Sequence, residues 1–367
     1  PRAAPRGRGR RPPRCPSGSC ARRGRRGKQQ PGACNAAGFP RGSLRTPGTL
    51  DGSGILWRLA SLHRQESPKP LLKLAKQNCA GKSGAAAAKA NSRAANRRFA
   101  AGWGRLQYKE YGKQNRDVIL LLHGGGLSWW NYREAAERLQ KEYRVMIPIL
   151  DGHAGSDKSF TTIEDNAAEI IAFIDAKLGG SVLLIGGLSL GGQILLEMLS
   201  QRKDICRFAM VESAAVIPSK LTYALIRPAF GSCYGLIRKK WFSKLQFRSL
   251  RIKPELFRDY YRDSCGITRQ NLIAFLQESS LYCMKKSLGE CTAEVHLFAG
   301  ERENKRILLS AEKLHKALEK SRLHLLPAMH HGEFSLDHAD RYAKEVCTIV
   351  QQHLPLCDTA GHKQDSL

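Results

Sequence analysis

A serine in a glycine-rich turn is the first residue of the chain whose setting suggests chemistry. Ser189 lies in the run Gly186-Gly187-Leu188-Ser189-Leu190-Gly191-Gly192, directly after the apolar residues 182–185. Between a buried strand and a helix, such a turn holds its serine in a strained backbone conformation, with the hydroxyl projecting above the sheet. Gly187 and Gly191 lack side chains that would collide with the neighbouring strand or helix. We therefore predict that Ser189 is a nucleophile; the competing interpretation is a purely structural glycine turn.

A serine hydroxyl needs a base to remove its proton at neutral pH. Two adjacent histidines, His330 and His331, follow a predicted strand at 323–326. A histidine on a loop just past a strand end is well placed to reach the serine turn. We choose His331 as the base because Gly332 after it allows a tight turn, and His330 is the alternative.

The base in turn needs a carboxylate that orients the imidazole and stabilises its charged form. The segment Ala299-Gly300-Glu301-Arg302-Glu303 follows a predicted strand at 295–298. Glu303 is the first choice, Glu301 the second, and Glu212, at the end of an earlier strand, the third. The competing interpretation is that these glutamates are solvated surface side chains.

Two backbone N–H groups are predicted to form an oxyanion hole. One belongs to Leu190, which follows the serine at the start of a helix, where developing negative charge is stabilised. The other belongs to Gly125 in the run His123-Gly124-Gly125-Gly126, which follows the apolar residues 118–122. We expect His123 to brace this loop by hydrogen bonding rather than to bind a metal or act as a base.

Strands and helices alternate from about residue 104 onward, which predicts a mainly parallel sheet covered by helices on both sides. Hydrophobic periodicity places strands at 106–111, 118–122, 145–149, 182–185, 208–211, 295–298 and 323–326, and helices at 132–141, 163–178, 193–199, 309–318 and 339–353. Thr161-Thr162-Ile163-Glu164 resembles a capping box at the start of the second helix.

The stretch 216–290 is rich in arginine, lysine and aromatic residues, with helical spacing and no strong strand. We predict a helical lid inserted before the last two strands; extra helices packed at the edge of the sheet are the alternative. The predicted organisation has four parts. Residues 1–100 form a basic low-complexity segment, 101–215 and 291–356 form the two parts of the α/β core, 216–290 form the lid between them, and 357–367 form a short tail.

The formal charge of +28 over 367 residues is concentrated at one end. Residues 1–100 contain 23 lysines and arginines but only 2 acidic residues, and their composition cannot bury enough apolar surface to fold. Three hypotheses compete: a tail attracted to phosphate backbones, an organellar targeting segment, or a segment that is not native to the protein. We favour the third, because the chain begins at Pro1 and has no methionine before Met146.

The cysteine pattern predicts a cytoplasmic protein without a zinc site, and the serine chemistry expected above needs no metal and no organic cofactor. The 11 cysteines include no C-x-x-C pair and no spacing with histidine suited to zinc, which favours free thiols in a reducing compartment. No apolar run is long enough for a transmembrane segment, and we expect no signal peptide.

Taken together, these motifs resemble the α/β-hydrolase family over residues 104–355. The matching pieces stand in family order: 121–125 for the oxyanion loop, Gly152-His153-Ala154-Gly155-Ser156 for a G-H-G-x-S turn, the serine turn, Gly300–Glu303 and His331-Gly332. Three positions depart from the family pattern: a glutamate replaces the commoner aspartate, Ala154 replaces a glycine, and Ile149 stands where aspartate is common. By this resemblance the nucleophile is Ser189, the acid Glu303 and the base His331.

The resemblance implies a serine hydrolase that acts on an ester, a thioester or a similar activated carbonyl through an acyl-enzyme. The expected substrate is a small molecule, and the aromatic residues of the lid favour an apolar acyl or aryl group. The alternatives are a carbon–carbon bond hydrolase or lyase, and a non-catalytic homologue that binds a small molecule. The serine argues against epoxide hydrolases and haloalkane dehalogenases, which use aspartate at this position. Nucleic acid is expected to bind only non-specifically, through residues 1–100.

Overall fold

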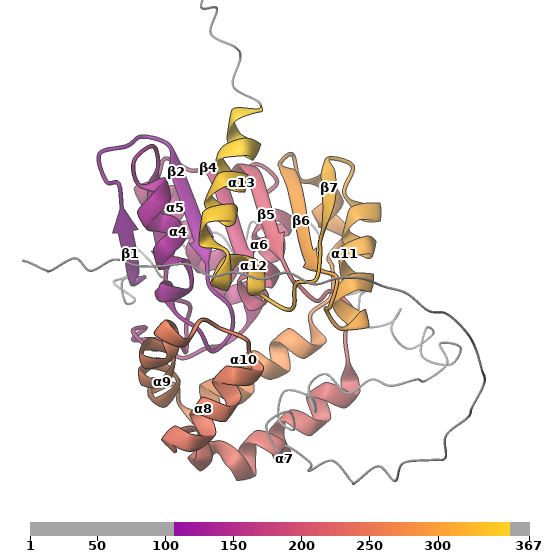
Figure 1. Cartoon of the computed structure of the whole chain (residues 1–367). Coiled ribbons are helices and arrows are strands. Elements are labelled where there is room, and N and C mark those ends of the chain that lie inside the picture. Colours follow the sequence, from indigo (N-terminus) through magenta and orange to yellow (C-terminus); the bar gives the residue numbers. More distant parts are fainter. Residues whose placement is uncertain (1–105, 353–367) are drawn as a thin grey trace, which may run out of the picture. The chain divides into compact units, whose positions relative to one another are not determined.

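The computed structural model describes residues 106–352. The predictions for the basic segment 1–100 and the tail 357–367 lie outside the described residues. Everything below concerns the described part of the chain (Figure 1).

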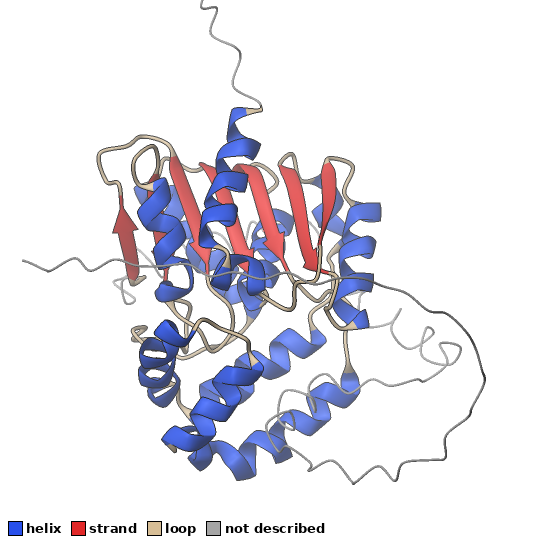
Figure 2. Cartoon of the chain, viewed as in Figure 1, coloured by secondary structure: helices blue, strands red, loops and turns tan. Residues whose placement is uncertain are grey.

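Seven strands form one sheet in the order β1-β3-β2-β4-β5-β6-β7 (Figure 2). Their bounds are Tyr108–Tyr111, Val118–Leu122, Arg144–Pro148, Val182–Leu188, Cys206–Glu212, Glu294–Gly300 and Ser321–Leu326 for β1 to β7. Only β1 pairs antiparallel, with β3, and every other pairing is parallel. The predicted α/β class with a mainly parallel sheet is confirmed. Because the six parallel strands run the same way, their carboxyl ends share one edge of the sheet.

Helices cover both faces of the sheet, as predicted (Figure 1). One face carries α4 and α13, whose apolar side chains share a core cluster, and the other carries α5, α6 and α11, which share a second cluster. The bounds of these helices and of the short α12 and η2 are Arg133–Leu139 (α4), Ile163–Lys177 (α5), Leu190–Gln201 (α6), Lys305–Ala317 (α11), Glu333–Asp337 (α12), Ala339–Gln351 (α13) and Trp129–Tyr132 (η2).

Strand β2 is a central strand that is buried on both faces and contains no polar residue. Its five residues, Val118 to Leu122, are all buried. Successive side chains point to opposite faces, so Leu120 and Leu122 enter one core cluster while Ile119 and Leu121 enter the other. A continuous apolar run is therefore what a strand between two helical layers requires.

A helical insertion separates β5 from β6 (Figure 1). It comprises α7 Lys220–Ile237, α8 Lys240–Ser249, η3 Pro254–Leu256, α9 Phe257–Gly266, α10 Arg269–Leu281 and η4 Lys286–Glu290. Within it α7 packs on α10, and α8 contacts both α7 and α9. Among the helices of the described part, none is both long and apolar enough to cross a membrane.

Two local predictions are wrong or incomplete. The capping box is displaced by one residue: the N-cap of α5 is Thr162, whose side chain accepts a hydrogen bond from the Asp165 N–H at 3.0 Å. Two adjacent threonines, each followed three residues later by an acid, make the register ambiguous in the sequence. The sequence pattern carries no signal for helix α12, because five residues are too few to show a helical period.

The serine turn allows a direct test of packing. A Cβ on Gly191 would lie 2.1 Å from the carbonyl oxygen of Leu122, whereas a Cβ on Gly235 in α7 would meet nothing within 4 Å. We expect Gly191→Ala to lower the free energy of unfolding by roughly 2–3 kcal/mol, because the backbone of β2 must shift. Gly235→Ala should leave it unchanged or raise it by about 0.5–1 kcal/mol, because alanine favours the helix. Urea unfolding of both variants checks this, and equal stabilities would contradict it.

Candidate active site

Ser189 lies at the tip of the turn between β4 and α6. Its backbone has φ 53° and ψ −108°, a conformation that side-chain-bearing residues rarely adopt. The turn is tightly packed, since a Cβ on Gly187 would lie 2.5 Å from the Gly191 carbonyl oxygen. The Ser189 N–H donates to the carbonyl of Glu212 at the end of β5, at 2.8 Å. The strained turn therefore holds the hydroxyl at the carboxyl edge of the sheet.

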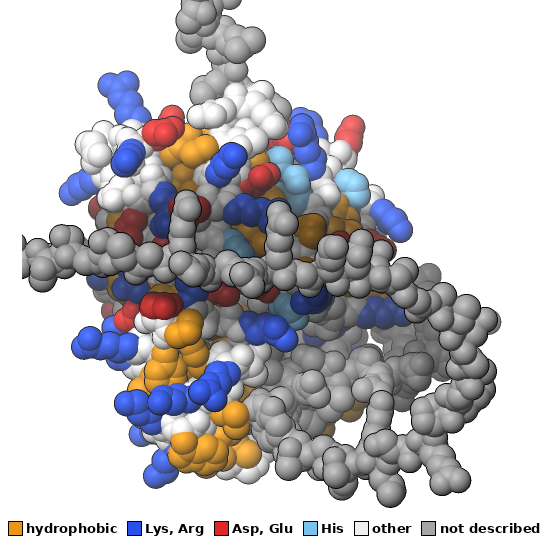
Figure 3. Space-filling model, viewed as in Figure 1, with side chains coloured by type: hydrophobic (Ala, Val, Ile, Leu, Met, Phe, Trp, Pro, Cys, Tyr) orange, Lys and Arg blue, Asp and Glu red, His pale blue; other side chains and the backbone are white. Residues whose placement is uncertain are grey.

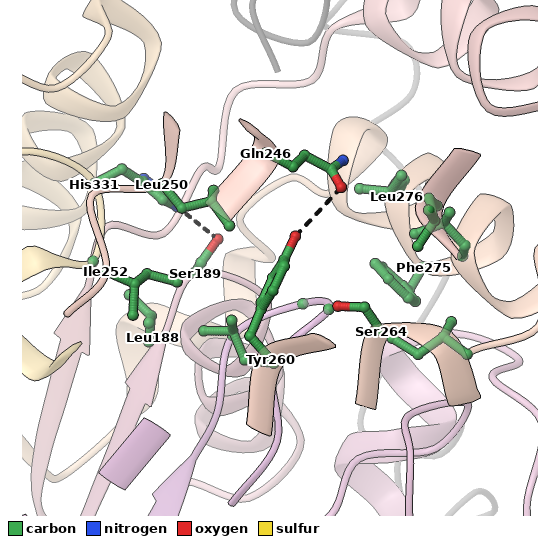
Figure 4. Close-up of a pocket in the computed structure, with 18 of the residues that line it drawn as sticks. Leu188, Ser189, Gln246, Leu250, Ile252, Tyr260, Ser264, Phe275, Leu276 and His331 are labelled. Atoms are coloured by element: carbon green, nitrogen blue, oxygen red, sulfur yellow. Dashed lines mark hydrogen bonds between the residues drawn. The ribbon is translucent and has the colours of Figure 1, made fainter. Parts of the chain in front are cut away.

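A continuous set of side-chain contacts links Ser189 to an imidazole and a carboxylate. The Nε2 atom of His331 lies 3.0 Å from the Ser189 Oγ (Figure 4). The Nδ1 atom of the same ring lies 3.0 Å from the Glu303 Oε2. His331 comes from the loop after β7, where Gly332 at φ 72° makes the turn into α12. Glu303 comes from the loop after β6. Three segments that are distant in the sequence thus meet at one edge of the sheet.

The Glu303 carboxylate is shielded from water and has a second partner. Its side chain is 0% exposed, against 32% for the His331 side chain. The Ser213 hydroxyl donates to the Glu303 Oε1 and also accepts the Gly332 N–H at 3.4 Å. Sequence reasoning missed Ser213, which directly follows Glu212 at the end of β5; no spacing pattern distinguishes it. It connects the two loops that carry the imidazole and the carboxylate.

The three alternative residues have other partners. The Glu301 Oε2 accepts the N–H of Ala328 at 3.0 Å. The His330 Nδ1 lies 3.1 Å from a carboxylate oxygen of Glu333, the first residue of α12. The Glu212 Oε1 accepts the N–H of Ser335 at 3.2 Å, and no hydrogen-bond partner for its Oε2 is found among the described residues.

Burial and neighbouring charge act in opposite directions on His331. Burial by itself would lower the pKa of His331, but the Glu303 carboxylate, through its charge and its hydrogen bond, raises it above its ordinary value of 6.5. Glu212 adds to this raising effect. Burial raises the pKa of Glu212 itself to about 7, so this carboxyl group is partly protonated near neutral pH.

The two predicted oxyanion N–H groups lie on adjacent segments. A Cβ on Gly125 would lie 3.5 Å from the Leu190 Cβ, so the loop after β2 contacts the start of α6. The N–H groups flanking Gly125 are already engaged: Gly124 donates to the Asn131 Oδ1 at 3.3 Å, and Gly126 donates to the His153 Nε2 at 3.0 Å. Among the described residues, the N–H groups of Gly125 and Leu190 have no acceptor.

These segments flank the crevice between β2 and β4, where the connections leave the sheet in opposite directions. Such a switch point, at the carboxyl ends of the strands, is the usual binding site of open α/β sheets.

His123 and His153 act as neutral acceptors that hold this region together. The His123 Nε2 accepts the N–H of Leu150 at 3.1 Å, while His153 accepts from Gly126. Burial lowers the pKa of His123 to about 3 and that of His153 to about 4, so both rings are uncharged at neutral pH. In the described range 106–352, no group of three or more histidine, cysteine, aspartate or glutamate residues is placed to hold a metal ion.

A pocket opens between this edge of the sheet and the helical insertion. It encloses about 970 Å³ of empty space, including its open mouth. Ser189 and His331 line one side, with Phe275 and Leu276 on the other and Tyr260 between them (Figure 4). The described residues that line the pocket include no lysine, arginine, aspartate or glutamate.

The polar groups of this pocket are few. The Tyr260 hydroxyl donates to the Gln246 Oε1 at 3.4 Å, and both side chains come from the insertion (Figure 4). Ser264 contributes a further hydroxyl to the wall. The wall of the pocket is thus largely apolar.

Comparisons with known proteins show that the chain is similar in sequence to two curated proteins. The chain is 26% identical to human Epoxide hydrolase 4 over 190 residues, which cover 47% of this chain and 51% of that protein. It is 27% identical to an AB hydrolase superfamily protein of Gibberella zeae over 135 residues, covering 36% and 46% of the two chains. The chain thus spans about half the length of the curated relatives it matches.

Solved structures agree with these matches at the level of the fold. An esterase from Exiguobacterium antarcticum has a TM-score of 0.58 at 18% identity, with 67% of this chain and 95% of that chain covered. The model of the Alpha/beta hydrolase family matches residues 119–345, which contain the whole contact set described above. On this match, together with the seven-stranded sheet, the chain belongs to the alpha/beta hydrolase family.

Proposed function

We propose that this protein is a serine hydrolase that cleaves an ester or thioester with an uncharged, apolar acyl or aryl group. The observation that carries the proposal is the pair of 3.0 Å contacts that join Ser189, His331 and Glu303. A hydroxyl, an imidazole and a buried carboxylate in this order are the parts of a nucleophilic relay.

In the first half of the reaction His331 removes the hydroxyl proton as the Ser189 Oγ attacks the carbonyl carbon. The carbonyl oxygen becomes an oxyanion, and the N–H groups of Gly125 and Leu190 donate to it. When the intermediate collapses, the bond to the leaving group breaks and His331 gives its proton to that group. The acyl group remains on Ser189.

In the second half a water molecule takes the place of the leaving group. His331 removes a proton from the water, which attacks the acyl carbon and passes through a second oxyanion. The acid product leaves and Ser189 regains its proton from His331. The mechanism needs no metal and no organic cofactor.

Glu303 is proposed as the carboxylate that orients His331. Its oxygen faces Nδ1, so the neutral imidazole keeps its proton there and presents Nε2 to the serine. The Glu212 carboxyl group accepts a backbone N–H from Ser335, and burial raises its pKa, which disfavours the charged form. A partly protonated carboxyl group stabilises an imidazolium less well than an ionised one.

The helical insertion is proposed to act as a lid that selects the substrate. Its side chains form much of the pocket wall, and the pocket lining has no charged residue among those described. A charged acyl group would lose its hydration there without gaining a partner. An apolar acyl or aryl group gains from burial. The cytoplasmic location remains a prediction that depends on the cysteine pattern.

Epoxide hydrolysis, suggested by the name of the human relative, is disfavoured by the residue at the turn. A carboxylate nucleophile that opens an epoxide leaves an ester, which water can hydrolyse. A serine that did the same would leave an ether, which water does not cleave under these conditions. Because residue 189 is serine, the acyl chemistry is the better match. Carbon–carbon bond hydrolysis, a lyase reaction and simple ligand binding remain as outcomes of the tests.

The first test uses a fluorophosphonate probe, which reacts with activated serines. The unsubstituted protein should be labelled, and Ser189→Ala should lose labelling and at least about a thousandfold in ester hydrolysis. Ser243→Ala is the matched control, because its hydroxyl is fully buried in α8 and does not line the pocket. No labelling of the folded protein would favour a non-catalytic binder. Labelling without hydrolysis of any p-nitrophenyl ester, short or long, would favour the carbon–carbon or lyase alternative.

The second test separates the glutamates. Glu303→Gln should lower kcat by about a hundredfold to ten-thousandfold, because the imidazolium loses its counter-charge. Glu212→Gln and Glu301→Gln should stay within about tenfold of the unsubstituted protein, since these side chains bond to backbone N–H groups. Steady-state kinetics with a p-nitrophenyl ester provide the measurement. A larger loss in Glu212→Gln than in Glu303→Gln would assign the acid to β5.

The third test follows the pH dependence. The base works only when it is neutral, so kcat/KM should rise with pH through a pKa above 6.5, the ordinary value for histidine. In Glu303→Gln the raising effect of the carboxylate disappears, and burial then lowers the pKa of His331. The acid limb of the profile should therefore move to lower pH, whereas Glu301→Gln should leave it in place. An acid limb that stays fixed in Glu303→Gln would show that Glu303 does not set the pKa of the base.

A further inference from the structure

The first two long helices of the insertion carry an unbalanced positive charge. Residues 220–253 contain nine lysines and arginines and no aspartate or glutamate. Lys253 pairs with Glu134. Among the described residues, none of the other eight has an acidic partner, and all eight are exposed: Lys220, Arg227, Arg238, Lys239, Lys240, Lys244, Arg248 and Arg251.

The same two helices expose large apolar side chains. Of the eight such side chains exposed by the described residues, four belong to α7 and α8: Leu221 (53% exposed), Tyr223 (40%), Leu225 (36%) and Trp241 (63%). Figure 3 shows hydrophobic side chains next to lysine and arginine side chains in the lower part of the view, over α8 and α9. On α8 the exposed Trp241 directly follows Lys240 and lies one helical turn from Lys244. An exposed apolar group with cations beside it indicates a surface that binds a partner.

The exposed and the buried side chains of helix α8 lie on two opposite faces of the helix. Trp241, Lys244 and Arg248 are spaced by three and four residues, so they lie on one face. On the opposite face Ser243 and Phe247 are buried, while Gln246, with Leu250 just beyond the helix, lines the pocket. The outer face therefore has no role in forming the pocket or the core.

We propose that the outer face of α7 and α8 is a docking surface for a bilayer that contains anionic phospholipids. The lysines and arginines contact the headgroup phosphates, and Trp241 inserts at the boundary between headgroups and acyl chains. Indole rings favour this depth, because their apolar body and polar N–H both find suitable surroundings there. Basic side chains near an anionic surface add to the affinity, and salt weakens their contribution.

A lipid surface explains these residues better than a nucleic acid does. Phosphates of either kind attract lysine and arginine, but the exposed leucines of α7 gain nothing from a nucleic-acid backbone. Burial of leucine and tryptophan side chains in a bilayer is favourable. The proposal does not depend on the chemistry of Ser189, because binding to vesicles is measured without any substrate.

The test is co-sedimentation of the full chain with vesicles of phosphatidylcholine alone or of phosphatidylcholine and phosphatidylglycerol at 70:30. We expect at least tenfold tighter binding to the anionic vesicles, and a loss of most of that difference on addition of salt. The combined change Lys239→Gln, Lys240→Gln and Lys244→Gln should weaken this binding at least tenfold. Its matched control removes three exposed lysines on and just after α11, at Lys313, Lys316 and Lys320, and should change binding less than threefold.

A second pair of variants tests the apolar contact. Trp241→Ser should weaken binding to anionic vesicles at least fivefold, whereas Leu325→Ser, at a site 54% exposed on β7, should have no effect. Brominated acyl chains should quench the tryptophan fluorescence of the unsubstituted chain more than that of Trp241→Phe. Circular dichroism and thermal melting of each variant confirm that the fold is retained.

Three outcomes would overturn the proposal. Equal binding to both vesicle compositions would remove the role of charge. Tight binding that ignores both the lysine and the Trp241 changes would assign the contact to another part of the chain, such as residues 1–100. Retention on a single-stranded oligonucleotide that depends on the α8 lysines, without binding to anionic vesicles, would identify the surface as a nucleic-acid site instead.

Discussion

The close contact between the start of α6 and the end of β2 is the constraint on which the site depends. Gly191 lies so near the Leu122 carbonyl that no side chain fits between them. This contact forces the chain to turn sharply after β4, and the turn leaves Ser189 with a positive φ and its hydroxyl at the edge of the sheet. The same approach brings the Gly125 loop to the first N–H groups of the helix. A looser turn would relax the backbone at Ser189 and would also move the N–H groups of Gly125 and Leu190 apart.

Parallel pairing then brings the remaining groups to that edge. The loops after β6 and β7 carry Glu303 and His331, and the hydroxyl of Ser213 links the two loops. Because the glutamate is buried and the imidazole is only partly so, the carboxylate acts on the pKa of His331 with little screening by water. The carboxyl groups of Glu301 and Glu212 lie nearby, but each accepts a hydrogen bond from a backbone N–H, that of Ala328 for Glu301 and that of Ser335 for Glu212. The three glutamates therefore differ in the position and the partners of their carboxyl groups, although their residue type is the same.

The helical insertion has two sides of different character, one that lines the pocket and one that faces outward. Its inner side forms an uncharged pocket, which suits the apolar acyl or aryl group of the proposed substrate. Its outer side has cations and an exposed tryptophan, which suit an anionic bilayer. The opposite character of the two sides follows from the amphipathic pattern of α8, in which buried and exposed positions alternate with the helical period.

The alternation of strands and helices can be recognised from the amino-acid sequence, because apolar periodicity and glycine spacing are local signals. The run 118–122 and the turn around Ser189 could each be recognised without any knowledge of distant residues. The folded structure alone shows which glutamate faces which histidine, since Glu212 is the last residue of β5, Glu301 and Glu303 follow β6, and both strands end at the same edge of the sheet. It also revealed Ser213, the cap at Thr162 and the two faces of the insertion. Those features depend on contacts between residues far apart in the chain, for which neither hydrophobic period nor local motif carries a signal.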